Sequence, residues 1–195
     1  MAQYRAVAAV CKALRDLLKE TYPRAEFGTK LEIETIQAKD VPDLTKEGIA
    51  ILLWRVAINT QRRNLPPRTD LLGRTFKPSL PLDLSIILLP YAATAERQHL
   101  LLGWVMRALA DSSGLAAGQL NNALAHTDVF ADIECVDLVC DPLGVADYLA
   151  LWSRIEKAPL SVNYLVRMVM LDSEQELTSG APVIERSFEV GSYLP

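Results

Sequence analysis

The stretch from Gly48 to Ile58, which reads GIAILLWRVAI, is apolar at nearly every position and carries a single charge, Arg55. Side chains of a β-strand alternate between two faces, so a strand that is apolar at both alternating positions needs cover on both sides. Either the fold itself covers both faces, or one face meets another subunit. The stretch therefore predicts a central or interface strand, and the sequence leaves the two alternatives open.

Further stretches carry strand patterns. Leu80–Tyr91 is expected to pair with Gly48–Ile58, because it repeats the strand pattern, with Asp83 and Ser85 at alternate positions and apolar residues between them. A strand pair is expected over about residues 161–190. Its members, Val162–Leu171 and Val183–Val190, either form a hairpin or leave one edge free, because the residues between them are turn-rich. Two shorter strands are expected over residues 31–37 and 133–139.

Apolar residues at helical spacing predict an amphipathic opening helix over Ala2–Glu20 and a second helix that begins after Thr94 as its N-cap and ends near Asp111. Shorter helical segments are expected over residues 115–125 and 145–155. This order of elements predicts an α+β fold in one domain, residues 1–195, with a mixed, mainly antiparallel sheet and helices packed on one face.

Charge is distributed unevenly along the chain. A long polar loop, about residues 59–79, holds a cluster of basic residues, whereas acidic residues dominate after Leu171. Such polarity fits subunits that meet in a fixed orientation, and it fits two solvated loops of opposite sign equally well. The net charge of −4 argues against nucleic-acid binding, which needs a clustered excess of Lys and Arg. The basic residues of the loop are Arg62, Arg63, Arg68, Arg74 and Lys77.

The sequence contains no motif that carries catalysis. Its glycines form neither a dinucleotide-binding nor a phosphate-binding loop, and His99 and His126 have no Cys or carboxylate at the spacing of a zinc site. Glu32 and Glu34 could form an acid–base pair, but their alternation is more typical of a solvated strand face. We therefore expect no enzymatic activity, no cofactor and no metal ion.

Three cysteines are too few and odd in number for a disulfide framework, so they are expected to be reduced, buried thiols of a protein assembled in the cytoplasm. No stretch approaches the roughly 18 uncharged residues of a membrane span, and charged residues interrupt the apolar N-terminus. Neither secretion by the general route nor direct membrane insertion is predicted.

Three stretches together resemble the family of cap or tail terminator proteins of contractile injection systems, the phage-tail-like particles. LWRVAINTQRRNLPPR, Leu53–Arg68, is similar to the family's strand that ends in Asn and is followed by an Arg-Asn pair and a double proline. In Leu80–Asp111, the strand, tyrosine turn and Leu-Gly-containing helix follow the family order. In Leu149–Leu171, a Leu-x-x-Trp helix precedes a proline turn and a Ser-x-x-Tyr strand.

The resemblance implies a structural subunit with the fold of contractile-phage tail terminators. Such a subunit forms a six-fold ring with copies of itself on the end of the inner tube, receives the last sheath ring and stops polymerisation of both. Its implied partners are the inner tube protein, the sheath protein and other cap paralogues. Assembly is expected in the cytoplasm, with release as part of an extracellular particle left open.

Two contact regions follow as hypotheses. The basic loop is expected to contact a neighbouring cap subunit or the tube rim, and the strand Val183–Val190 is expected to receive a sheath arm. The alternatives are another ring component of the same machine, such as a baseplate or tube-end adaptor, and a small enzyme with an unrecognised site. The candidate interface residues are Arg55, Asn59, Arg62, Arg63, Asn64, Arg68, Val183, Glu185 and Phe188.

Overall fold

The computed structural model describes residues 4–62, 64–70, 72–112, 114–124, 130–131, 134–153 and 159–177. Five α-helices and eight strands lie in these residues, together with two short 3₁₀ helices. In chain order the elements are α1 (Ala6–Thr21), α2 (Arg24–Phe27), β1 (Glu32–Ile36), η1 (Ala38–Asp43), β2 (Gly48–Ile58), η2 (Thr60–Arg62), β3 (Arg68–Thr69), β4 (Thr75–Phe76), β5 (Leu80–Tyr91), α3 (Ala95–Asp111), β6 (Leu115–Ala116), α4 (Ala117–Leu124), β7 (Cys135–Cys140), α5 (Val145–Trp152) and β8 (Val162–Leu171).

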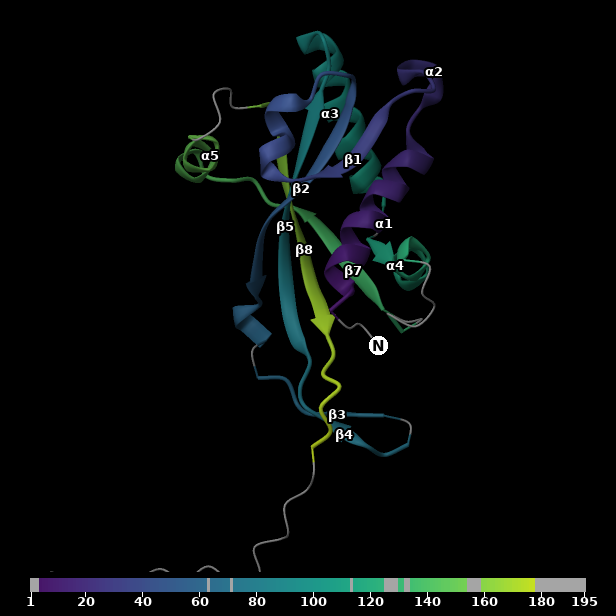
Figure 1. The fold of residues 1–195 in the computed structure, drawn as a ribbon, viewed down its shortest axis with the longest axis vertical. Helices are drawn as coiled ribbons and strands as arrows, with labels where there is room; N and C mark the ends of the chain where they lie inside the picture. The colour runs from purple at the N-terminus through teal and green to yellow at the C-terminus, as the bar shows by residue number, and fades with distance from the viewer. Residues whose placement is uncertain are drawn as a thin grey trace, which may run out of the picture.

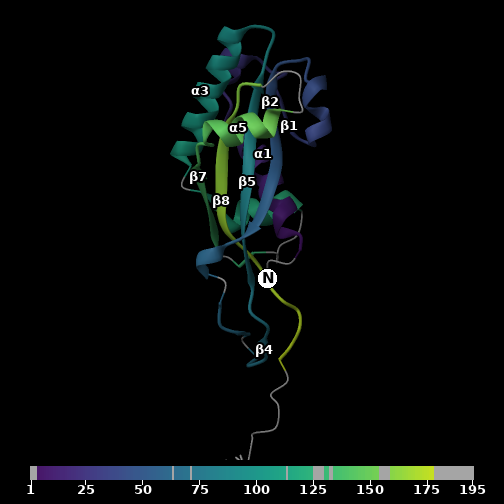
Figure 2. The same ribbon diagram turned by 90° about the vertical axis from the view of Figure 1, so that its left-hand side faces the viewer.

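Six strands form one twisted sheet in the order β1-β2-β5-β8-β7-β6 (Figures 1 and 2). β1 runs parallel to β2, and every other neighbouring pair is antiparallel. The predicted pairing of Gly48–Ile58 with Leu80–Tyr91 is confirmed, since β2 and β5 pair from Gly48 opposite Tyr91 to Ile58 opposite Leu82. The α+β class and the mixed, mainly antiparallel sheet are likewise confirmed.

One face of the sheet is covered by α1, α3 and α4, which form the larger core with it. Leu14 and Leu18 of α1 are fully buried there, as are Leu101 and Val105 of α3. The even-numbered residues of β5 from Leu82 to Leu88 face this core, because alternate residues of a strand point to the same side. The helical periodicity predicted for α1 and α3 thus corresponds to their buried faces.

The opposite face has a smaller core of its own, so the prediction that helices pack on one face was incomplete. Val41 of η1 and Trp152 of α5 pack there against Leu52, Ile87 and Leu89. The physical reason lies in β2 and β5, which are apolar at both alternating positions and therefore need cover on both faces. Figure 2 shows α5 crossing in front of the upper part of the sheet.

The start of β2 fits closely between its two neighbours. A Cβ placed on Gly48 would lie 2.1 Å from the backbone oxygen of Glu32 on β1 and 2.7 Å from the hydroxyl of Tyr91 on β5. Only glycine leaves room for this approach of backbone and ring, so Gly48 sets the spacing at which the parallel strand β1 joins the sheet.

The polar loop predicted over residues 59–79 contains a small hairpin, β3–β4, that the sequence did not reveal. The chain that follows β8 pairs with it, because Phe76 and Glu176 form an antiparallel bridge and the Leu177 amide donates to the Thr75 carbonyl at 2.7 Å. Figure 1 shows this hairpin projecting beyond the end of the main sheet. The second member of the predicted C-terminal strand pair, Val183–Val190, lies outside the described residues.

Candidate protein-interaction surface

Asn59 ends β2 and holds the start of the basic loop. Only 4% of its surface is exposed. Its side-chain oxygen accepts hydrogen bonds from the amides of Gln61 and Arg62 at 3.0 and 3.2 Å, and its side-chain nitrogen donates to both carboxylate oxygens of Asp83, at 2.9 and 3.2 Å. Asn59 therefore fixes the point at which the loop leaves the sheet. Its side chain is buried within this chain rather than presented on the surface.

Asp83 links Asn59 to an irregularity in β8. The register between β5 and β8 shifts between Leu82 and Leu84, and Met168 on β8 has a positive φ of 61° there. Such a bulge leaves a backbone amide without its ladder partner. The Met168 amide instead donates to Asp83 Oδ1 at 3.1 Å. One carboxylate thus stabilises both the end of β2 and the bend of β8.

Some basic residues of the loop interact with residues of the acidic segment after β8 in the same chain. The guanidinium of Arg68 stacks on the ring of Phe76, 4.6 Å from its centroid, and lies 3.8 Å from the carboxylate of Asp172. Asp172 also accepts a hydrogen bond from Ser79 at 2.6 Å, and the Lys77 side chain donates to Gln175. The basic loop and the acidic segment after β8 therefore contact each other, so the two are not simply solvated loops.

A second internal ion pair stiffens the tip of the hairpin. Asp70 accepts from the amides of Leu72 and Arg74, both at 2.9 Å, and pairs with the Arg74 side chain at 2.7 Å. Desolvation is the largest single effect on the pKa of Asp70 and raises it, but the hydrogen bonds from Arg74 and Leu72 and the charge of Arg74 together outweigh it and hold the pKa below its usual value. Arg74 thereby serves the turn itself.

The remaining candidate residues of the loop face outward. Arg55, Arg62 and Asn64 are exposed, and their side chains have no hydrogen bond or ion pair within the part of the chain that the structure describes. The other candidates lie outside that part: Arg63, Val183, Glu185 and Phe188.

Apolar side chains gather beside these free cations, at the end of the sheet that α1 and α5 leave uncovered. Val56 and Ile58 on β2 are 47% and 44% exposed, and Leu80 at the start of β5 is also exposed. We call Arg55, Val56, Ile58 and Leu80 the open end of the sheet. The sequence signalled it only through the apolar character of β2 on both faces, one of the two alternatives being a contact with another subunit.

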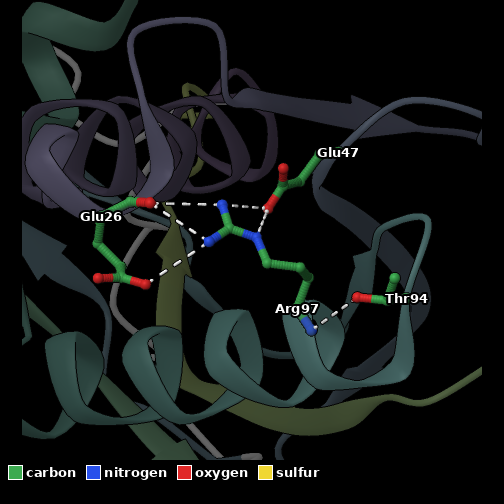
Figure 3. Close-up of polar contacts among 4 residues, drawn as sticks. All are labelled: Glu26, Glu47, Thr94 and Arg97. Carbon is green, nitrogen blue, oxygen red and sulfur yellow. Dashed lines mark hydrogen bonds and ion pairs between the residues drawn. The ribbon is translucent and has the colours of Figure 1, made fainter.

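The opposite end of the molecule is fixed by a polar cluster around Arg97 of α3 (Figure 3). Its guanidinium lies 2.8 Å from the Glu47 carboxylate and 3.5 Å from that of Glu26, and it stacks on the Phe27 ring at 5.2 Å. The amide of Arg97 donates to Thr94 Oγ1 at 3.3 Å, which confirms Thr94 as the N-cap. This cluster joins α2, β2 and α3 and is structural in character.

The described residues offer no constellation for chemistry. They contain no group of three or more His, Cys, Asp or Glu side chains able to hold a metal ion. His99 lies exposed on α3, and His126 lies outside the described residues. Burial, and then the nearby carboxylates of Glu34 and Glu32, raise the pKa of Tyr91.

The cysteine prediction was only partly right. Cys11 is buried in the core between α1 and the sheet, but Cys135 and Cys140 on β7 are exposed because that strand lies near the margin of the sheet. None of the three is in a disulfide. Over the described ranges, no helix combines the length and the apolar character that crossing a membrane requires.

The family described as the Pvc16 N-terminal domain matches residues 9–185. The chain belongs to that family. None of the curated proteins matches the chain in sequence. Among solved structures, the chain is similar to the sheath/tube terminator of PVC, an extracellular contractile injection system, in its extended state, with a TM-score of 0.66 and 17% identity. It is also similar to the tube terminating cap of the anti-feeding prophage, with a TM-score of 0.60 and 13% identity.

These likenesses concern the fold. The first covers 100% of this chain and 65% of the terminator, and the second covers 91% of this chain and 59% of the cap. The chain therefore spans less than two thirds of the length of each of these solved relatives. The resemblance predicted from the three sequence stretches is confirmed at the level of the family and the fold.

Proposed function

We propose that this chain terminates the sheath and the inner tube of an extracellular contractile injection system. The observation that carries the proposal is the family match over residues 9–185, together with a fold likeness to a sheath/tube terminator that extends over the whole of this chain. The role is structural, and the polar clusters around Asn59, Asp70 and Arg97 suit it, since they stabilise turns and strand ends.

The proposed mechanism is a one-sided fit. A terminator needs one surface that is complementary to the growing end and must lack a copy of that end on its other side, so that no further ring can add. Here the open end of the sheet and the basic loop lie at one end of the molecule, whereas the Arg97 cluster closes the other end with internal contacts. This asymmetry supports a single docking side.

Within this proposal, copies of the chain form a ring, six-fold by resemblance, and the basic loop with Arg62 and Arg63 contacts a neighbouring cap subunit or the tube rim. The strand Val183–Val190 receives the sheath arm, and other cap paralogues are further partners. The particle assembles in the cytoplasm and is released with the cap attached. Arg63 and the Val183–Val190 strand lie outside the described residues, so their roles rest on the sequence alone.

The test is electron microscopy of particles from cells with and without the gene. Loss of the gene is expected to give sheath–tube assemblies of irregular or runaway length that are open at one end, and the wild-type gene restores uniform length. Unaltered particles in the deletion strain would refute the proposal and favour another position in the machine.

A charge-reversal variant, Arg62→Glu with Arg63→Glu, tests the basic loop in the same cells. It is expected to leave the monomer folded and to reproduce the irregular lengths. The matched control reverses two exposed lysines, Lys30→Glu with Lys39→Glu, which changes the net charge by the same amount far from the loop. Uniform particles with both variants would exclude a role for the loop.

A further inference from the structure

The outer edge of β2 is only partly paired. β1 pairs with β2 from Gly48 to Leu52 and ends there. Within the described ranges, no strand pairs with the outer edge of β2 from Arg55 to Ile58. Because the Asn59 amide donates to Pro81 on β5 and backbone groups alternate along a strand, the N–H and C=O groups of Val56 and Ile58 point away from β5. They are free to pair with another strand.

The opposite margin of the sheet has a matching free edge. β6 pairs only with Cys135 and Val136 of β7. Asp137–Cys140 pairs with β8 on its inner side and has no strand on its outer side within the part of the chain that the structure describes. The side chain of Val139 in this edge is 44% exposed. Unpaired edges of this kind attract a strand from another chain unless something blocks them.

The two free edges lie at the same level of the sheet. Following the registers from strand to strand, Arg55 pairs with Ser85, Ser85 with Leu165, and Leu165 with Val139. By the same path, Val56 is level with Leu138. Three successive antiparallel pairings also make β2 and β7 run in opposite directions. A second copy in the same orientation, moved sideways, therefore presents its β7 edge antiparallel to the β2 edge of the first.

The flanking strands leave room for this contact. β1 extends the β2 margin at the level of Gly48–Leu52, whereas β6 pairs with Cys135 and Val136, which are level with Ile58, so Arg55–Ala57 and Asp137–Val139 lie between the two. β1 of one copy and β6 of the next therefore lie at different levels of the sheet, on either side of the proposed contact. Figure 2 shows β7 and β1 at the two opposite margins of the sheet.

Charge and apolar surface are complementary across the same contact. In an antiparallel pair, Arg55 would face Val139 of the next copy, with Asp137 and Asp141 of that copy as its diagonal neighbours on the same face. Both aspartates are exposed and, among the described residues, form no ion pair with another side chain. Within its own chain, Asp137 lies opposite Arg167 on β8, so Asp141 is the acid with no basic residue paired beside it. On the other face, the exposed Val56 would cover Leu138.

We infer that copies of this chain join by pairing the β2 edge Arg55–Ala57 of one copy with the β7 edge Asp137–Val139 of the next. This is a head-to-tail contact between two different surfaces, which closes into a ring when it involves rotation without a shift along the axis. The equal level of the two edges supplies that condition. The inference rests on the ring in the proposed function and identifies the surfaces that form it.

Cysteine cross-linking of the full chain tests the inference. The variant carries Arg55→Cys and Val139→Cys, with Cys135→Ser and Cys140→Ser to remove the exposed native thiols. Arg55 and Val139 of one chain are separated by three strand spacings, about 14 Å, which is too far for an internal disulfide. Oxidation with copper phenanthroline is therefore expected to give a ladder of covalent oligomers that ends in a closed ring on a non-reducing gel.

The matched control moves one cysteine to an exposed site away from the edge, as Arg55→Cys with Leu149→Cys in the same background. It is expected to stay monomeric on the gel. A folded Arg55→Cys/Val139→Cys variant, verified by circular dichroism, that gives no ladder in assembled particles would overturn the inference, as would an equal ladder in the control.

Particle length separates this inference from the proposed function. A ladder together with unaltered particles in the deletion strain would refute the terminator role and leave the interface standing. Runaway particles in the deletion strain without any ladder would support the terminator role and refute this interface.

Discussion

Replacing Asn59 by alanine should destabilise the chain more than its small size suggests. The change removes the side-chain oxygen that accepts from the Gln61 and Arg62 amides, a loss comparable to that of a helix N-cap, about 1 kcal/mol. It also removes a donor from the Asp83 carboxylate, and a buried acceptor that loses its partner costs about 1–3 kcal/mol. Asp83 is partly exposed and keeps the Met168 amide, so we expect a total of about 2–3 kcal/mol.

Urea unfolding followed by circular dichroism measures this loss. With a slope of about 2 kcal/mol per molar urea, the midpoint should fall by about 1 M while the slope stays unchanged. The control is Asn64→Ala, the same substitution in the same loop at an exposed position, which should shift the free energy of unfolding by less than about 0.5 kcal/mol. Equal effects of the two substitutions would refute the assignment of Asn59 as the residue that fixes the loop.

Three further predictions concern stability. Gly48→Ala should lower the free energy of unfolding by at least about 1–3 kcal/mol, because the added methyl group clashes with β1. Gly103→Ala, at an open position in a helix, should instead raise it by about 0.5–1 kcal/mol. Thermal unfolding of the two variants measures the difference. Arg97→Ala, which loses its ion pairs with Glu47 and Glu26, should lower the urea midpoint more than Arg107→Ala, which loses one exposed helical ion pair. Burial raises the pKa of Cys11 to about 11, above the unfolded value of about 8.5. The contribution of the buried thiol to stability is therefore complete below about pH 8.5 and falls toward pH 11. Between about pH 8 and pH 10.5, the free energy of unfolding in urea should fall more for the wild type than for Cys11→Ala.

The long elements could be predicted from the sequence because residues at their ends mark where they begin and stop. β2, β5 and β8 begin and end at the predicted residues, since each is a run of apolar residues closed by turn-forming or polar residues. Thr94 marked the start of α3 for a similar reason, since a threonine oxygen before a helical stripe satisfies a free amide of the first turn. The boundaries of these elements thus depend on residues that are close in the sequence.

Features that depend on a distant partner escaped the prediction. The bulge at Met168 is defined by its register against β5, and the two-residue strands β3 and β4 are too short to show a period. The surroundings of Arg68 depend on Phe76 and on Asp172, which lies beyond the last strand of the sheet. A count of basic residues in the loop therefore overstated how many of them are available to a partner.

The apolar character of β2 has two causes, and they apply to different halves of the strand. From Gly48 to Leu52 the strand is buried, with β1 on its edge and cores on both faces. From Arg55 to Ile58 the strand loses that neighbour and Val56 and Ile58 are exposed. Cover within the fold thus explains the first half of the strand, and the contact with another subunit that we infer would explain the second half. An isolated monomer gains nothing from exposed valine and isoleucine beside a free strand edge, whereas a ring subunit gains both apolar contact and backbone pairing there.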